Sequence, residues 1–510
     1  MEQQSQFARF FESLSNLTAG RLTSPEYERQ PLASWEIPGN SAWLLTDVRI
    51  VDVDNGKLRP QTDLLVKGDR IEALILPGEI DGLRQRYEIV AEIDGGGRHL
   101  IPGLSDIHCH LTLINEYEMG LGSLRHFPSQ RLRNAESTLE AGCTFIRDSG
   151  SAVETIQYLA HEIEGGRLLG PRIFASNGAV TPKGGMWYIN PIVNKLYEGV
   201  AGGTALHYPG DDDALADRLE FLQRSGCDFL KTYFEHRPFC GKDESAEYTL
   251  FTPEQARQIR RFADQQGKLV EAHTMFIEGS RRAIDAHLDS LAHLTLDEPY
   301  SVEDAAHMAD NGVAIVPTLS LGMYLSMDCG PHGFPDHPDV RYFIRERQRT
   351  LPDLIERRTV EPLRHSYQAL ASFLDERLPE RKMVPLGPVI AGRVHGMARH
   401  AQESLMRFQD AGVQVGVGTD AGTGVSFCGS LGTELRTLIR FGYTEAQVLR
   451  MATLGNMEIL RLADELGSIE PGKYADMVLL GDNPLEDINA IETVRQVFKG
   501  GRLVYTADDC

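Results

Sequence analysis

The sequence predicts an α/β protein built on a (β/α)8 TIM barrel, with a small β-sandwich domain formed from both chain ends. Eight short apolar segments alternate with helical patterns between residues 101 and 466. Strand-like runs flank this region on both sides, and 510 residues suffice for one large domain and one smaller one. We therefore assign residues 101–466 to the barrel.

The N-terminal part of the chain divides into a polar extension and a tract of short strands. Residues 1–41 are mostly polar and are expected to be an N-terminal extension. Within 42–100, apolar and polar residues alternate in short runs separated by turn signals such as Asp54-Asn55-Gly56, which favours a small antiparallel sheet. A second strand-rich tract lies at the other end of the chain. The β-sandwich is therefore assigned to residues 42–100 and 467–510 together.

Eight segments within the central region are the expected barrel strands. Several follow a helical pattern that ends at glycine, as at Gly142 and Gly412. The segments are residues 101–108, 144–148, 172–176, 229–233, 269–273, 290–294, 314–318 and 413–420. A largely helical insertion at about 322–400 separates the last two. It could be a lid, an oligomer contact or a neutral addition, and homo-oligomers are expected for such barrels.

Composition excludes several classes of protein. The chain has 73 acidic and 51 basic residues, a formal net charge of −22, which argues against binding the phosphate backbone of nucleic acids. No apolar run is long enough to span a bilayer, and the first residues do not resemble a signal peptide. Seven cysteines without a CxxC motif do not suggest a disulfide framework. We expect a cytoplasmic protein that binds neither nucleic acid nor a membrane.

The tripeptide His108-Cys109-His110 ends the apolar run of the first barrel segment. Side chains at i and i+2 of a strand point to the same side, so both imidazoles can face one ion. Neutral imidazoles suit Zn²⁺ or a similar cation. Such a pair often occurs by chance, so residues at the other strand ends are needed to show whether it belongs to a metal site.

Six ionisable side chains fall near the carboxyl ends of the expected strands: His108 and His110 on the first, Lys231 on the fourth, His273 on the fifth, His293 on the sixth and Asp420 on the eighth. Each has a structural alternative, since a histidine can pack in a core and an aspartate can cap a helix. Active sites of such barrels gather at this end of the strands. Together the six side chains predict one metal centre.

With these residues in this order, the chain resembles the amidohydrolase superfamily, over about residues 42–505. The similarity includes residues 102–110, the Gly-Thr-Asp-Ala-Gly run at 418–422 and residues 467–476. The most similar branch holds imidazolonepropionase-related amidohydrolases and metal-dependent Xaa-Pro or Xaa-Arg dipeptidases. The resemblance implies a metal-dependent amidohydrolase, a peptidase-like enzyme that acts on carbon–nitrogen bonds.

The resemblance also implies two divalent ions, zinc by default, although Mn²⁺ and Co²⁺ suit the oxygen ligands too. The implied ligands are His108, His110 and Asp420 for the more buried ion, and His273 and His293 for the more exposed one. N6-carboxylated Lys231 would bridge both ions. A free ammonium has no acceptor, whereas a carbamate is an anionic bidentate ligand.

The implied reaction is hydrolysis of an amide bond, in a dipeptide or an N-acyl amino acid, by a metal-bridging hydroxide. Asp420 would take the proton of that hydroxide and pass it to the leaving nitrogen. Tyr233 lies two residues after Lys231, on the same strand face, and could polarise the carbonyl or be a core tyrosine. The substrate-binding residues are unknown. The loop at 181–188 is a candidate, and Arg147 and His207 could bind a carboxylate or be structural.

Two other readings remain open. A mononuclear deaminase, or a cyclic-amide or lactone hydrolase, of the same superfamily would use a glutamate near His273, such as Glu271 or Glu278. It would not need Lys231, although the presence of this lysine favours the dinuclear centre. A binding protein without activity is the third reading, but no expected ligand is missing from the sequence.

Overall fold

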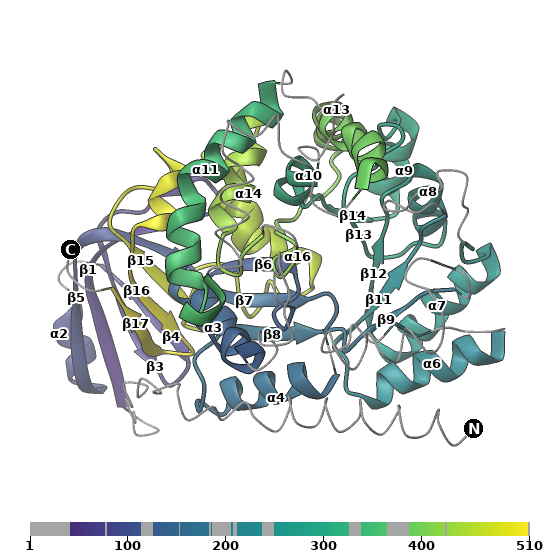
Figure 1. Cartoon of the computed structure of the whole chain (residues 1–510). Coiled ribbons are helices and arrows are strands. Elements are labelled where there is room, and N and C mark those ends of the chain that lie inside the picture. The colour runs from purple at the N-terminus through teal and green to yellow at the C-terminus, as the bar shows by residue number, and fades with distance from the viewer. Residues whose placement is uncertain are drawn as a thin grey trace.

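The computed structural model describes residues 41–76, 79–113, 126–151, 153–182, 185, 206–207, 212–236, 249–325, 338–364, 387–423 and 426–507. The expected N-terminal extension and most of the candidate loop at 181–188 lie outside these residues. Strands from the two chain ends form a layer on one side, and the central region forms the rest (Figure 1). Among the helices described, none is both long and apolar enough to cross a membrane.

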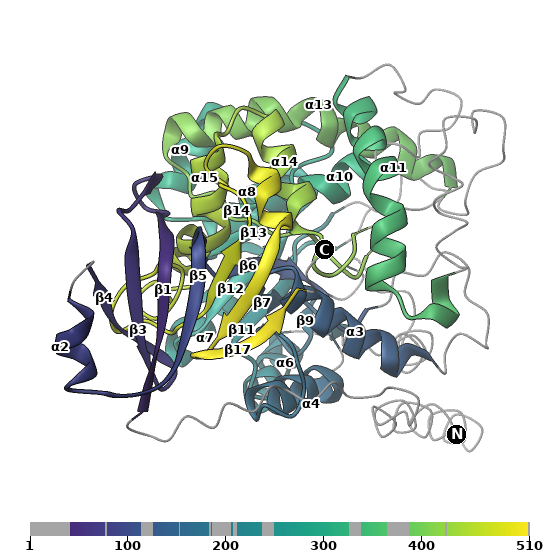
Figure 2. The same cartoon turned by 90° about the vertical axis from the view of Figure 1, so that its left-hand side faces the viewer.

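The two chain ends meet in one eight-stranded sheet, seen as purple and yellow strands side by side (Figure 2). Its order is β17-β16-β15-β5-β1-β3-β4, and β2 pairs with β1. The strands are β1 (Ser41–Asp52), β2 (Lys57–Leu58), β3 (Thr62–Lys67), β4 (Arg70–Ile75), β5 (Glu88–Pro102), β15 (Met477–Leu480), β16 (Val494–Lys499) and β17 (Arg502–Thr506). A buried cluster that includes Trp43, Leu100 and Phe498 packs against it. Apolar residues from both ends therefore share one core.

This sheet differs from the expected antiparallel one. β1 pairs with β5 in parallel and with β3 antiparallel, and the ladder runs through all the strands as a single sheet. The split into two sheets of a sandwich is not confirmed. β5 also takes in Ile101 and Pro102, which the sequence assigned to the first barrel strand. The break falls at Gly103, where a Cβ would stand 2.0 Å from Thr144 Oγ1.

The central region contains two parallel sheets. One has the order β6-β7-β8 and the other β10-β9-β11-β12-β13-β14. The strands are β6 (Leu104–Cys109), β7 (Cys143–Asp148), β8 (Arg172–Ala175), β9 (Ala179–Val180), β10 (Leu206–His207), β11 (Phe229–Tyr233), β12 (Leu269–His273), β13 (Ser290–Ala292) and β14 (Ala314–Val316). Seven of the eight expected segments overlap one of these strands; β9 and β10 were not predicted. The chain therefore has mixed α/β content with parallel sheets.

The eighth expected strand, at 413–420, is not a continuous strand. It makes two isolated parallel bridges, Val415 with Ile315 and Ala421 with Cys109, so it lies between β14 and β6. Within the described residues, the ladders do not close into one ring. The side chain of Asn456 bonds to both the N–H and the C=O of Val417, and this C=O also accepts from the N–H of Ile107 in β6. Asn456 also bonds to Ser105, so it ties this segment to β6.

Helices alternate with the parallel strands and cover them (Figure 1). They are α3 (Phe127–Glu140), α4 (Val153–Glu164), α6 (Asp212–Arg224), α7 (Pro253–Gln266), α8 (Ile277–Asp285), α9 (Val302–Asp310), α14 (Leu431–Arg440), α15 (Glu445–Arg450) and α16 (Asn456–Ile459), with η4 (Met451–Gly455) before the last. In α7 a capping box of Thr252 and Gln255 starts the helix, and Gly267 at φ 63° ends it. Local sequence signals thus set the strand–helix rhythm.

The expected insertion is helical in its described parts. These are α10 (Leu319–Leu325), α11 (Pro338–Arg358), η3 (Glu361–Leu363) and the first part of α13 (Gly387–Ala411), whose last turns precede the 413–421 segment. Two short helices lie near the chain ends, α2 (Ile80–Arg84) and η5 (Ile488–Glu492). α10 packs against α11, α13 and α14, which joins the insertion to the helices around the parallel sheets.

Asn456→Leu is expected to lower the free energy of unfolding by about 3 kcal/mol. The buried amide of Asn456 joins β6 to the 413–421 segment through Ser105 and Val417. Leucine would leave the buried N–H of Val417 without its acceptor and would remove the hydrogen bonds that the Asn456 amide donates to Ser105 and Val417. Urea unfolding followed by circular dichroism measures the effect. Asn311→Leu is the control, because Asn311 makes a hydrogen bond only at the exposed end of α9. Equal effects in the two variants would contradict this role for Asn456.

Candidate metal centre

Two of the expected ligands, Asp420 and His293, have an unusual backbone conformation with a positive φ. Asp420 has a φ of 53° and His293 a φ of 74°, in the left-handed region that residues with a Cβ seldom adopt. Asp420 is held there by its own N–H, which donates to the carbonyl of His108 at 2.7 Å. At Gly418, just before it, a Cβ would stand 2.6 Å from the Cβ of His108. The chain therefore brings Asp420 directly against the end of β6.

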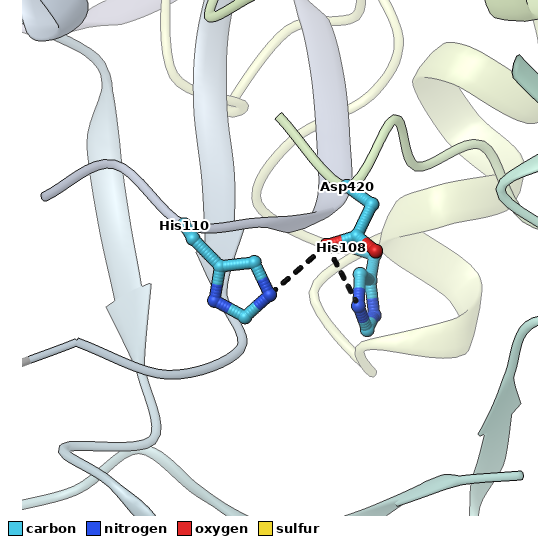
Figure 3. A group of neighbouring side chains, drawn as sticks. All are labelled: His108, His110 and Asp420. Carbon is cyan, nitrogen blue, oxygen red and sulfur yellow. Dashed lines mark ion pairs between the residues drawn. The ribbon is translucent and has the colours of Figure 1, made fainter. Parts of the chain in front are cut away.

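His108, His110 and Asp420 form a compact buried cluster (Figure 3). Asp420 Oδ1 lies 3.0 Å from His110 Nε2 and 3.7 Å from His108 Nε2. One ligand atom from each residue lies within 4.8 Å of the others. Oδ1 of Asp420 is buried and makes no hydrogen bond of good geometry. A buried carboxylate oxygen in this environment is suited to bind a cation. These three residues could hold a divalent ion.

The outer nitrogens of both histidines are occupied. His108 Nδ1 lies 2.7 Å from Glu271 Oε1, and His110 Nδ1 lies 2.8 Å from the carbonyl oxygen of Gly150. Each acceptor calls for a proton on Nδ1, so Nε2, which faces Asp420, is the nitrogen available to a metal ion. Histidines that bind metals commonly have such a partner on the other nitrogen. The geometry thus fixes the tautomers that a metal site requires.

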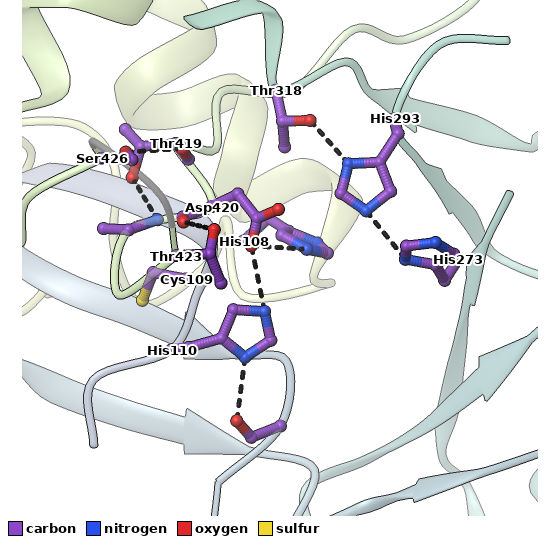
Figure 4. Close-up of polar contacts among 12 residues, drawn as sticks. His108, Cys109, His110, His273, His293, Thr318, Thr419, Asp420, Thr423 and Ser426 are labelled. Atoms are coloured by element: carbon purple, nitrogen blue, oxygen red, sulfur yellow. Dashed lines mark hydrogen bonds and ion pairs between the residues drawn. The ribbon is translucent and has the colours of Figure 1, made fainter. Parts of the chain in front are cut away.

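His273 and His293 face each other a short distance away (Figure 4). His293 Nε2 lies 2.9 Å from His273 Nδ1, and His293 Nδ1 lies 2.7 Å from Thr318 Oγ1. The ring of His293 is 4.9 Å from that of His108, centroid to centroid. Four imidazoles therefore belong to one buried group. The structure brings together all the histidines that the sequence assigned to the centre.

Burial keeps His108, His273 and His293 neutral; burial also opposes the charged form of His110, but the contact with Asp420 outweighs it and raises the pKa of His110. Burial first, and Lys231 second, lower the pKa of His108 to about 4. Burial and His293 lower the pKa of His273 well below its ordinary value, and burial and His108 do the same for His293. Burial would raise the pKa of Asp420, but its contact with His110 and the nearby His108 hold it well below the ordinary range. Neutral imidazoles and an ionised carboxylate are the forms that bind metal.

Lys231 is also in the centre, but it is paired with a carboxylate. Lys231 Nζ lies 3.0 Å from Glu271 Oε2, and Arg147 Nη2 lies 2.5 Å from Glu271 Oε1. All three side chains are almost completely buried. Glu271 therefore contacts two buried cations and His108 at once. Burial lowers the pKa of Lys231, and Glu271 only partly offsets this.

The sequence did not predict that Glu271 pairs with Lys231 and His108. It was considered only as the glutamate of a mononuclear deaminase. A signal was present: it lies two residues before His273 in an apolar strand, on the same face. A carboxylate there must be paired when buried. Arg147 is not free to bind a substrate, since it also donates to the carbonyl of Ile107 and to Ser290 Oγ. Of the two roles considered for Arg147, substrate binding and a structural role, the contacts support the structural one.

Tyr233 and Glu235 lie beside the second histidine pair. The ring of Tyr233 is 4.7 Å from that of His273, and Lys231 Nζ is 5.9 Å from its centroid. Glu235 Oε1 lies 3.4 Å from His273 Nε2, and burial raises the pKa of Glu235 well above its ordinary value. Tyr233 is thus adjacent to the expected ligands, and Glu235 is a neighbour that the sequence did not indicate. Nothing is described for the side chain of His207.

The chain is similar to known hydrolases over most of its length. The Amidohydrolase family profile matches residues 99–504. Ochratoxinase from Aspergillus niger is 24% identical over 427 residues, 79% of this chain and 75% of that protein. Imidazolonepropionase from Phocaeicola vulgatus is 38% identical over 101 residues, 19% of this chain and 24% of the relative.

Solved structures share the fold. A prolidase complexed with N-methylphosphonate-L-proline has a TM-score of 0.67 and 22% identity, and covers 92% of this chain and 100% of that one. The structure of A. niger ochratoxinase has a TM-score of 0.66 and 21% identity, over 91% of this chain and 95% of its own. The described core of strands and helices is therefore arranged as in these proteins.

Proposed function

We propose that this chain, which belongs to the amidohydrolase family, is a two-metal hydrolase that cleaves an amide bond of a dipeptide or an N-acyl amino acid. As a family member it is a hydrolase that acts on carbon–nitrogen bonds. One observation carries the two-metal assignment. The cluster of His108, His110 and Asp420 lies against a second pair of imidazoles, with Lys231 buried nearby.

The ligand sets follow from the contacts. His108, His110 and Asp420 would hold the more buried ion, His273 and His293 the other, and N6-carboxylated Lys231 would bridge them. Divalent ions, zinc by default, would supply a water made nucleophilic at neutral pH and an electrophile for the scissile carbonyl. Asp420, whose pKa is held low, is ionised at neutral pH and can accept the proton of the attacking water. It then delivers this proton to the leaving nitrogen, and Tyr233 polarises the carbonyl.

The state of Lys231 supports its proposed carboxylation. Carboxylation joins the neutral amine nitrogen to the carbon of CO₂ and releases one proton. Burial favours the neutral amine, because it lowers the pKa of Lys231. After the change, Glu271 would lose one cationic partner but keep Arg147 and His108, to which it is bonded at 2.5 and 2.7 Å. The carbamate could then turn toward the histidines.

The finer architecture is also part of the proposal. We infer that residues 101–466 form a closed (β/α)8 barrel and that 42–100 and 467–510 form a β-sandwich beside it. The two bridges of the 413–421 segment, one to β14 and one to β6, support closure on that side. The strands shared by both chain ends support a composite second domain. The names prolidase and Xaa-Pro dipeptidase among the structural neighbours support a dipeptide as substrate.

Lys231→Ala is expected to lower the metal content from about two ions per chain to about one, and to lower kcat/KM by at least about 10²-fold. Chains grown with bicarbonate and zinc, and purified without chelator, are assayed by elemental analysis and with a library of Xaa-Pro dipeptides and N-acyl amino acids. ¹³C-bicarbonate labelling would add a carbamate signal in the ¹³C NMR spectrum of the unmutated chain. The control is Lys473→Ala, because Lys473 pairs with Glu470 far along the chain from the ligands.

One ion in the unmutated chain, together with full activity of Lys231→Ala, would contradict the dinuclear centre. The mononuclear deaminase, or the cyclic-amide or lactone hydrolase, would then be the better reading. The partial match to imidazolonepropionase is the observation that favours this second candidate. Deamination and ring-opening substrates would then replace the dipeptide library.

A further inference from the structure

A cavity separate from the metal centre collects arginine side chains. It has a volume of about 490 Å³ and is lined by residues of α11, the end of α3, the start of α14 and the C-terminal strands. Five arginines line it: Arg349, Arg357, Arg358, Arg436 and Arg495. Among the described residues that line it, none is one of the six expected metal ligands. These arginines gather here although the chain as a whole has a strongly negative net charge.

The carboxylates that line this cavity are already paired. Each has an arginine partner: Glu140 with Arg133 at 2.7 Å, Asp353 with Arg357 at 2.7 Å, and Glu492 with Arg436 at 2.6 Å. Arg349 pairs with Glu346, which also pairs with Arg436. Glu140 and Asp353 also favour the charge of Arg358 from a distance, but neither forms an ion pair with Arg358 or Arg495 among the described residues.

Arg358 and Arg495 have donors without acceptors. Nε of each is buried and makes no hydrogen bond. Arg358 donates through Nη1 to the carbonyl of Ser137 and makes no ion pair within the described part of the chain. For Arg495, no side-chain hydrogen bond or ion pair to any described residue is present. Both side chains are otherwise partly exposed, and a buried N–H donor without an acceptor favours a group bound beside it.

The first turn of α14 opens on the same cavity through Leu431 and Gly432. Its N-cap residue, Ser430, gives no side-chain hydrogen bond to the helix. The N–H groups of a helix start attract anions. Arg358 lies at this end of the helix, because a Cβ on Gly429 would stand 2.6 Å from Arg358 Nη1. Gly429 has a φ of 81°, so glycine permits both the turn and the approach of the guanidinium.

We propose that this cavity binds an oxyanion, the phosphate or carboxylate group of a small molecule, between Arg358, Arg495 and the first turn of α14. The planar guanidinium of arginine matches both kinds of oxyanion. The volume is in the range of small-molecule sites. The site is independent of the catalytic proposal, because it shares no residue with the metal centre.

Isothermal titration calorimetry with inorganic phosphate and with citrate tests the site and separates the two sources of oxyanion. Arg495→Met is the principal variant. The side chain of Arg495 makes no hydrogen bond or ion pair with another described residue, so its loss should not disturb the fold. We expect its Kd for the bound oxyanion to rise at least about tenfold. Arg358→Met should behave similarly. Arg461→Met is the matched control, since Arg461 pairs with Asp289 elsewhere on the surface.

The titrations are repeated on chelator-treated protein, so that an oxyanion taken up by metal ions is recognised. Binding of either probe that persists without metal and weakens in Arg495→Met supports the proposal. Absence of binding by both probes, or equal affinity in Arg495→Met and Arg461→Met, would overturn it. Binding that disappears with the metal would also overturn it, because it would belong to the metal centre.

Discussion

Glu271→Ala is expected to lower the free energy of unfolding by about 3–5 kcal/mol. The side chain of Glu271 is fully buried and is the carboxylate that contacts the guanidinium of Arg147 and the ammonium of Lys231. Alanine would leave the guanidinium of Arg147 buried without a counter-charge, and also the ammonium of Lys231 wherever that lysine is not carboxylated. The midpoint of urea unfolding, followed by circular dichroism and by tryptophan fluorescence, measures the loss.

Two further variants separate charge from packing. Glu271→Gln keeps the volume and some of the hydrogen bonds but removes the charge, so it should recover only part of the stability. The double variant Glu271→Leu with Arg147→Met removes a charge of each sign and should be less destabilised than Glu271→Ala. An unfolding midpoint of Glu271→Ala equal to that of the unmutated chain would show that the three charges are not coupled.

Asp420→Asn is expected to lower kcat/KM by at least about 10³-fold and to release the more buried ion. The amide cannot accept the proton of the attacking water, and it binds a divalent cation more weakly than a carboxylate does. Asparagine tolerates the positive φ of Asp420, so the fold should survive the change. Metal content by elemental analysis, kinetics and the unfolding midpoint together distinguish loss of function from loss of structure.

Asp410→Asn is the matched control, because Asp410 is an exposed residue at the end of α13. It should keep both ions and full activity. An Asp420→Asn variant with near-normal turnover would contradict the assigned proton transfer. If Asp420→Asn keeps two ions but loses turnover, Asp420 acts as the base but is not needed to bind the metal.

The residues that converge in the centre could be predicted because each occupies the end of a strand. Alternation places His108 and His110 on one side of β6, and the parallel strands bring His273 and His293 close to them. Asp420 also lies beside them, although its segment is not a continuous strand. A side chain can therefore reach this group from outside a strand when its backbone is fixed by other hydrogen bonds.

Other features depend on contacts between distant residues and left little trace in the sequence. The parallel pairing of β1 with β5 is invisible to local alternation, which is the same for either direction of pairing. The break at Gly103 depends on Thr144, which is 41 residues away in strand β7. The role of Glu271 depends on Arg147 and Lys231, two residues on other strands. Such partners become apparent only when the strands are side by side.

The composite sheet has a consequence for how the chain folds. β5 pairs with β1 on one side and with β15 on the other, and the whole central region separates β5 from β15 in sequence. During synthesis, the end of β5 must wait with unpaired backbone groups until Met477–Leu480 emerges. Sheet formation between such distant segments is slow, and an open strand edge invites association with other chains. Refolding yield should therefore fall as protein concentration rises, and chaperones that shield strand edges should restore it.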